Sequence, residues 1–159
     1  MVVLTPHQAL RRRAIACLAR REHSRAELAQ KLAARFEADS SEIDTVLDEL
    51  VAQGLQSDQR FAESWVRSKA ARFGSARLRH DLLAKGVAAE LVEAVLAEAI
   101  SGEESKEGDE AARARALWQH RFGQPATDVR ERAKQARFLQ GRGFSSAVIG
   151  TLLREVARA

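Results

Sequence analysis

Basic side chains in two stretches of this sequence are its best candidates for binding a ligand. They are Arg67, Lys69, Arg72, Arg77, Arg79 and Lys85 in the first stretch, and Arg130, Arg132, Lys134, Arg137 and Arg142 in the second. Guanidinium and ammonium groups form charge-assisted hydrogen bonds with phosphate and carboxylate oxygens. The expected chemistry is therefore the binding of an acidic polymer, with no covalent bond made or broken.

Basic and acidic residues are segregated along the chain. Residues 11–35 hold eight basic and two acidic residues (net +6), residues 60–86 seven and two (net +5), and residues 111–142 eight and two (net +6). Between them, residues 37–58 hold seven acids and residues 87–100 hold three, with no Lys or Arg in either range. A periodic basic stripe suits nucleic acid, or a filament that carries it. The competing interpretation is that basic helices pair with acidic helices within the molecule.

Residues that serve catalysis or metal binding are scattered. The histidines, none paired at ligand spacing, are His7, His23, His80 and His120. The chain has no Walker motif, no G-x-G-x-x-G fingerprint, no G-x-S-x-G and no H-E-x-x-H. The sequence therefore predicts a protein that is not an enzyme and holds no metal and no cofactor. The lone Cys17 and the short apolar runs predict a cytoplasmic protein without a membrane span.

Apolar residues recur at spacings of three and four along nearly the whole chain, which predicts an all-α protein. Thr5-Pro6, Ser24, Ser40 or Ser41, and Ser57 or Asp58 are the expected starts of successive helices. Gly54 and Gly86 are expected to end helices.

Nine expected helices fall into three sets of three. Residues 86–96 align with residues 143–153 at an offset of 57, and Arg-Phe-Gly occurs at both 72–74 and 121–123. We therefore predict three tandem three-helix repeats that form an elongated, curved helical array. The predicted boundaries are 1–55, 56–100 and 111–159, with an acidic flexible hinge at 101–110.

Four aromatic residues are predicted to lie in the core. Trp65 and Trp118 fit the spacing of apolar stripes, which favours the core over a base-stacking surface. Phe138 adjoins Leu139 on such a stripe, and Phe144 aligns with Val87 of the preceding repeat.

Three ordered segments resemble the RecX family of regulators of the RecA recombinase. They are GLQSDQRFAESWVR (54–67), RLRHDLLAKGV (77–87) and RFLQGRGFS (137–145). Together with SRAEL (24–28), the resemblance covers about residues 10–157. The chain departs from the family pattern where Ser57 replaces the more usual Asp, and Phe61 and Trp65 take the aromatic positions because it has no Tyr.

The resemblance implies a partner and an effect that composition alone does not. The partner is the RecA filament on single-stranded DNA, bound in the filament groove, with double-stranded DNA as a further ligand. The implied effect is inhibition of RecA strand exchange, ATP hydrolysis and coprotease activity, with consequences for recombination and the SOS response. We expect the chain to act as a monomer. We also expect its two basic stretches to be separate binding sites on the filament, or footholds, joined by the hinge.

Two other functions fit parts of the sequence. A helix-turn-helix transcription regulator also uses three-helix units, but it inserts its last helix into the major groove of DNA. The corresponding ranges here, 37–58 and 87–100, are acidic, so phosphate repulsion would oppose insertion. The other alternative is a helical scaffold that binds proteins only.

Overall fold

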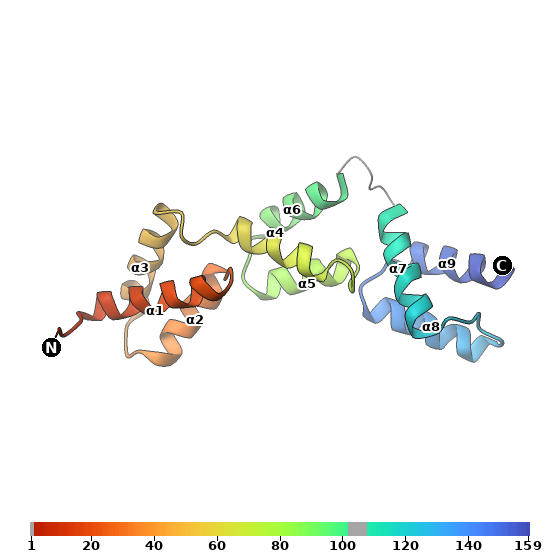
Figure 1. The fold of residues 1–159 in the computed structure, drawn as a ribbon, viewed down its shortest axis with the longest axis horizontal. Helices are drawn as coiled ribbons and strands as arrows, with labels where there is room; N and C mark the ends of the chain where they lie inside the picture. Colours follow the sequence, from red (N-terminus) through yellow and green to blue (C-terminus); the bar gives the residue numbers. More distant parts are fainter. Residues whose placement is uncertain (1, 102–107) are drawn as a thin grey trace. The chain divides into compact units, whose positions relative to one another are not determined.

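The computed structural model describes residues 2–101 and 108–159, and every regular element in these ranges is an α-helix (Figure 1). The nine helices are α1 (Pro6–Arg20), α2 (Arg25–Arg35), α3 (Ser40–Ala52), α4 (Asp58–Lys69), α5 (Ser75–Ala84), α6 (Ala89–Ser101), α7 (Gly108–Arg121), α8 (Val129–Gly141) and α9 (Ser146–Arg158). The predicted all-α class with three tandem sets of three helices is confirmed. Of the predicted hinge, residues 102–107 lie outside the described residues, whereas its ends belong to α6 and α7.

Short polar side chains determine where several helices begin. The side chains of Thr5, Ser24 and Asp39 each accept a hydrogen bond from the backbone amide of the third helical residue. The Gln or Glu side chain of that residue in turn accepts a hydrogen bond from the backbone amide of the cap. This reciprocal capping box satisfies amides that have no partner within the helix. The α3 helix begins at Ser40, one of the two predicted starts, and Asp39 before it is the N-cap residue.

Backbone packing divides the chain into two compact units, and the first comprises Met1–Trp65 with Leu82–Val92. Its main core lies among α1, α2 and α3, which contribute one apolar face each. The buried side chains of this core are Leu10, Ala14, Cys17, Leu28, Leu32, Ile43, Val46, Leu47 and Leu50. Burial of each Leu, Ile or Val contributes roughly 1.5–3 kcal/mol to the hydrophobic driving force for folding.

The second unit comprises Val66–Asp81 with Glu93–Ala159. Its main core lies among α7, α8 and α9 and consists of Ala114, Trp118, Leu139, Phe144, Ile149, Leu152, Leu153 and Val156. The indole Nε1 of Trp118 donates to Oε1 of the buried Gln135 at 2.9 Å. Gln135 in turn donates to the Gln124 carbonyl at 3.1 Å, so the polar atoms inside this core are satisfied.

The predictions for the aromatic residues are confirmed for two side chains and wrong for two. Trp118 and Phe144 are buried, with 4 % and 3 % of their surface exposed. Trp65 and Phe138 are only half-buried. Phe138 packs at the edge of the main core of the second unit beneath Arg142, and the Trp65 ring lies beneath Lys85. Helical spacing alone cannot distinguish such an edge position from the centre of a core.

Within the first unit, the loop after α5 meets the N-terminus of α2. The Ser24 hydroxyl, at the N-cap of α2, donates to the Lys85 carbonyl at 2.7 Å. The next residue, Gly86, has φ +81°, and a Cβ atom there would overlap the methyl group of Ala26. We call this contact of Ser24, Ala26, Lys85 and Gly86 the first joint.

Within the second unit, the loop after α8 meets the N-terminus of α5 in a corresponding way. The Gly74 amide donates to the Arg142 carbonyl at 2.8 Å. Gly143 has φ +88°, and a Cβ atom there would overlap the backbone of Arg77. These residues form the second joint, with Lys85-Gly86 and Arg142-Gly143 related by the 57-residue offset of the sequence repeat.

A carboxylate completes each joint at the first amide of the same helix. The Arg25 amide donates to Oδ1 of Asp58 at 2.8 Å, and the Ser75 amide donates to Oε1 of Glu110 at 3.3 Å. The unpaired amides and the positive end of a helix dipole both favour an anion at this position. Glu110, predicted to belong to an exposed hinge, is thus a half-buried residue of α7 that contacts α5.

We predict that Gly143→Ala destabilises the protein more than Gly54→Ala. Both glycines have positive φ, so both substitutions carry a conformational cost of roughly 1–2 kcal/mol. At Gly54 a Cβ atom meets nothing within 4 Å, whereas at Gly143 it overlaps Arg77. Urea unfolding of the two variants measures the difference, and equal losses of stability would contradict the close approach at the second joint.

Candidate nucleic-acid interface

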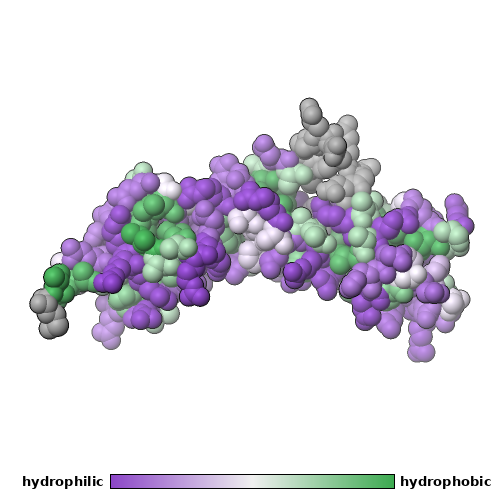
Figure 2. Space-filling model, in the orientation of Figure 1, coloured by the Kyte–Doolittle hydropathy of each residue, from purple (hydrophilic) through white to green (hydrophobic). Residues whose placement is uncertain are grey.

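The predicted basic residues lie on three helices and the loops that follow them. Those that are exposed are Arg67, Arg72, Arg77, Arg130, Arg132, Lys134 and Arg137. The half-buried ones are Lys69, Arg79, Lys85 and Arg142. Hydrophilic side chains also predominate over each three-helix set on the face shown in Figure 2, with apolar side chains in small patches between them.

Intramolecular ion pairs already engage part of the predicted set. Arg77 Nε lies 3.0 Å from Oδ1 of Asp81, one helical turn away in α5. Arg79 pairs with Glu93 of α6. The hydrogen bond between them raises the pKa of Arg79 and lowers the pKa of Glu93. For Arg79 the competing interpretation, pairing of a basic with an acidic helix, holds, whereas Arg77 pairs within its own helix.

Lys85 has its charge compensated in the first unit. Its Nζ lies 3.1 Å from Oε1 of Glu27 and 5.5 Å from the centre of the Trp65 ring. Burial by itself would raise the pKa of Glu27, but hydrogen bonds from Arg21, Lys85 and the Ser24 amide together lower it. Lys85 therefore helps to hold the first joint and offers less charge to an external ligand than the sequence suggested.

A second subset carries exposed charge without an acidic partner. Within the described residues, no ion pair or hydrogen bond engages the heads of Arg67, Arg72, Arg130, Arg132, Lys134 and Arg137. All of these residues belong to the second unit. We call this set the open cations.

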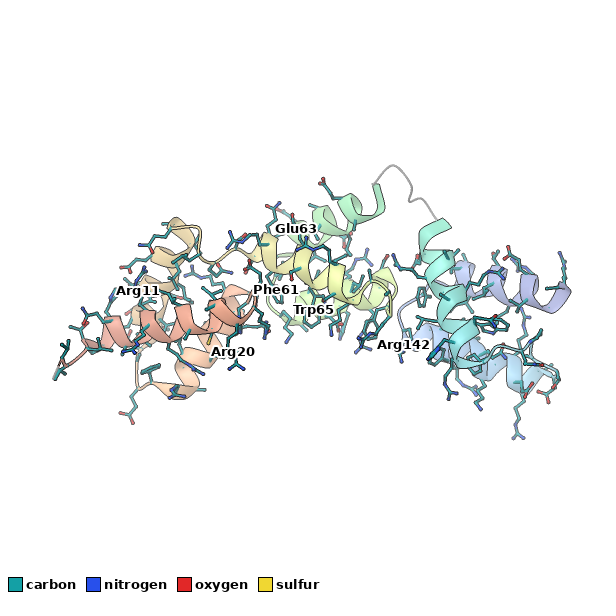
Figure 3. The ribbon with its side chains drawn as sticks, in the orientation of Figure 1. Arg11, Arg20, Phe61, Glu63, Trp65 and Arg142 are labelled. Atoms are coloured by element: carbon teal, nitrogen blue, oxygen red, sulfur yellow. The ribbon has the colours of Figure 1, made fainter. Side chains whose placement is uncertain are left out.

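Phenylalanine rings connect the two basic stretches. Arg77 and Arg142 both lie over the ring of Phe73, with guanidinium carbons 5.1 and 5.4 Å from its centre. Arg142 also lies 5.3 Å from the centre of Phe138. Figure 3 shows Arg142 at the C-terminal end of α8. The two stretches therefore adjoin at Phe73, and the prediction that they form separate footholds is wrong at this point.

Arg121 extends this row and was missed by the sequence analysis. Its guanidinium carbon lies 5.4 Å from the centre of Phe122 and 5.9 Å from that of Phe138. The two rings meet edge to face at 5.4 Å. The repeat of Arg72-Phe73-Gly74 as Arg121-Phe122-Gly123 was the signal that could have identified it. We call Phe73, Arg77, Arg121, Phe122, Phe138 and Arg142 the Arg–Phe row.

The open cations and the Arg–Phe row offer a defined chemistry. Unpaired guanidinium groups bind phosphate oxygens in bidentate fashion and release counterions from a nucleic-acid strand. Half-buried phenylalanine edges beside them suit unstacked bases, which bind aromatic side chains with little regard to sequence.

Neither feature performs a reaction, and no group of three or more His, Cys, Asp or Glu side chains among the described residues is placed to hold a metal ion. In that same part of the chain, no helix has the length and apolarity needed to cross a membrane.

The structure thus defines the class of protein as an all-α chain of three tandem three-helix sets. Models of the first, second and third three-helix domains of RecX match residues 11–50, 57–96 and 108–153. The chain belongs to the RecX family.

Curated relatives support the same assignment over nearly the whole length. The chain is 48 % identical to "Regulatory protein RecX" of Leptothrix cholodnii over 94 % of its own residues and 90 % of that protein. It is 42 % identical to the protein of the same name from Ralstonia pickettii over 91 % and 86 %. The crystal structure of RecX from Lactobacillus salivarius superposes with a TM-score of 0.78 over 97 % of this chain and 98 % of that one. At 19 % identity, it shows the shared fold.

We predict that the ion pairs of Glu27 contribute stability that depends on pH. Because its folded-state pKa lies below the ordinary value of 4.5, this contribution is present above that value and is lost as the pH falls through the folded-state pKa. Glu27→Gln keeps an amide oxygen for the capping box but removes the charge. We expect it to lower the free energy of unfolding by about 1 kcal/mol at neutral pH, with a smaller effect in acid as the Glu27 carboxylate becomes protonated.

The matched control is Glu42→Gln, which makes the same change at the same capping-box position of α3, where Glu42 is exposed. Urea unfolding of the unsubstituted chain and the two variants, at neutral pH and in acid, measures the effect. A deficit in Glu27→Gln that is no larger than in the control, or that persists unchanged in acid, would show that the pairs with Arg21 and Lys85 contribute no net stability.

Proposed function

We propose that this chain is a non-catalytic regulator that binds the RecA–single-stranded-DNA filament in its groove. Binding inhibits RecA strand exchange, ATP hydrolysis and coprotease activity, and so modulates recombination and the SOS response in the cytoplasm. Membership of the RecX family supports the regulatory part of this proposal. RecA as the partner follows from the family resemblance of the sequence.

The observation that carries the proposal is the set of open cations in the second unit. A nucleoprotein filament presents phosphate groups and acidic side chains at regular intervals, and both pair with exposed guanidinium groups. The sites proposed for contact are Arg67, Arg72, Arg130, Arg132, Lys134 and Arg137. The half-buried Lys69 lies beside them near the end of α4, and the Arg–Phe row continues the surface.

The distribution of acids argues against a helix-turn-helix regulator of double-stranded DNA. The helices that would enter the major groove in the first two sets are α3 and α6. Both helices carry several Asp or Glu residues and no Lys or Arg. Entry of such a helix into the groove would bring carboxylates against phosphates.

We predict that the triple variant Arg130→Glu, Arg132→Glu and Arg137→Glu inhibits RecA far less than the unsubstituted chain. The measurement is the concentration that halves RecA ATP hydrolysis on single-stranded DNA. The reversal places negative charge against phosphate, so we expect this concentration to rise by about tenfold or more.

The matched control reverses the same number of exposed arginines outside the proposed surface. Arg12→Glu, Arg35→Glu and Arg158→Glu together change the net charge equally. Equal losses of inhibition in the two triple variants would show that only net charge matters and would contradict the proposed surface. A full-length, folded chain that leaves RecA ATP hydrolysis unchanged would refute the proposed function itself.

We also predict a steep salt dependence for direct binding to single-stranded DNA. Each phosphate neutralised adds about 0.7 to the slope of log affinity against log salt concentration. Removing three contacts by the triple variant should therefore lower the slope by about 2 between roughly 50 and 200 mM salt. A slope that is flat in the unsubstituted chain, or identical in the variant, would exclude an electrostatic footprint at these residues.

A further inference from the structure

A basic cavity lies in the first unit, lined by α1, the loop that follows it and Lys31 of α2. Its volume is about 600 Å³, within the range of small-molecule sites. The charged or titratable side chains that line it are Arg13, Arg20, Arg21, His23 and Lys31, and no Asp or Glu is among the lining residues.

The α1 helix places two of these cations on one face. Arg13 and Arg20 are seven residues apart, so they project from the same side two turns from each other. Ala16 and Cys17 lie between them and also line the cavity. Their short side chains leave room for a ligand between the two guanidinium groups.

Positive charge in this cavity is largely uncompensated. Arg21 is bound to Glu27 at 3.2 Å, but within the described residues no carboxylate pairs with Arg13, Arg20 or Lys31. The Nε atom of Arg13 is buried without a hydrogen-bond partner. Arg11 on the same helix also has one buried nitrogen, Nη1, without a hydrogen-bond partner, but it donates to Gln53 of α3 at 2.6 Å and lies 3.9 Å from Glu49.

The wall of the cavity contains a buried histidine that also lacks an acidic partner. His23 is 2 % exposed, and its Nε2 lies 2.9 Å from the Lys31 Nζ. Because an ammonium group can only donate, His23 must be neutral and accept at Nε2, while its Nδ1–H donates to the Arg21 carbonyl at 3.0 Å. Burial, with the nearby charges of Arg21 and Lys31, lowers the pKa of His23 against the opposing effects of the Arg21 carbonyl and Glu27.

We propose that this cavity binds clustered phosphate groups. Arg13 and Arg20 would each present a planar fork to the non-bridging oxygens, and Lys31 would add a third cation held in place by His23. Two sources present such phosphates, a nucleoside triphosphate and consecutive backbone phosphates of a nucleic-acid strand. The site is composed of residues of the first unit, whereas the open cations belong to the second unit. Figure 3 labels Arg20 near the end of α1.

Calorimetric and NMR titrations of the full chain with inorganic triphosphate, ATP, adenosine and a short oligothymidylate test this proposal. The first readout is the dissociation constant, and the second is the position of the His23 imidazole resonances. We expect triphosphate to bind with one-to-one stoichiometry and to shift those resonances, and adenosine to do neither. The double variant Arg13→Gln and Arg20→Gln should weaken triphosphate binding by about tenfold or more.

Arg12→Gln is the matched control, because Arg12 is an exposed neighbour on α1 that does not line the cavity. If ATP binds as tightly as triphosphate, the cavity is a nucleotide site. If oligothymidylate displaces triphosphate from the cavity and ATP does not, the cavity binds the backbone phosphates of a nucleic-acid strand. Equal weakening by the double variant and by Arg12→Gln would overturn the proposal. The proposal would also be overturned if saturating triphosphate left the His23 resonances of the unsubstituted chain unchanged. This readout does not depend on the folding of any variant.

Discussion

The N-terminus of the second helix in a three-helix set is where the next set attaches. Backbone amides at this point have no partner within their own helix, and they carry the positive end of its dipole. In the first unit, Asp58 and the Lys85 carbonyl satisfy groups at the start of α2. In the second unit, Glu110 and the Arg142 carbonyl do the same at the start of α5. One constraint, the need to satisfy these helix ends, thus explains two joints between successive sets.

Glycine makes both joints possible. The chain must turn sharply after Lys85 and after Arg142, and it must bring its backbone against a neighbouring helix in the same step. Gly86 and Gly143 allow this because they adopt positive φ and present no Cβ atom. The second joint also fixes the side chain of Arg142 against Phe73, and so brings the basic residues of α5 and α8 beside one another. The candidate interface therefore depends on backbone packing as much as on its charges.

Much of the fold was predictable from the sequence because it rests on local rules. Apolar periodicity and short polar caps identified the helices, and the 57-residue offset identified the repeat. The partners of individual charges were not predictable. Arg79 and Lys85 look the same in the sequence as Arg67, yet Glu93 and Glu27 engage them through contacts between separate helices. Phe138 was misjudged for a related reason, since Arg121 and Arg142 cover a ring that its spacing places in the core.

The central claim is that the basic residues of the second unit form one surface because the second joint holds them together. Gly74→Ala tests it directly, since a Cβ atom at Gly74 would lie 2.6 and 2.8 Å from backbone atoms of Gly143 and Phe144, while every cation remains. The measurement is the affinity of the folded variant for the RecA filament on single-stranded DNA. The control is Gly141→Ala, whose added Cβ meets nothing within 4 Å. We expect Gly74→Ala to weaken binding by about tenfold, as for two linked sites that lose their fixed spacing, and Gly141→Ala to bind normally. The account would be contradicted if NMR showed that Gly74→Ala has lost the hydrogen bond from the residue 74 amide to the Arg142 carbonyl and the variant still bound the filament with unchanged affinity.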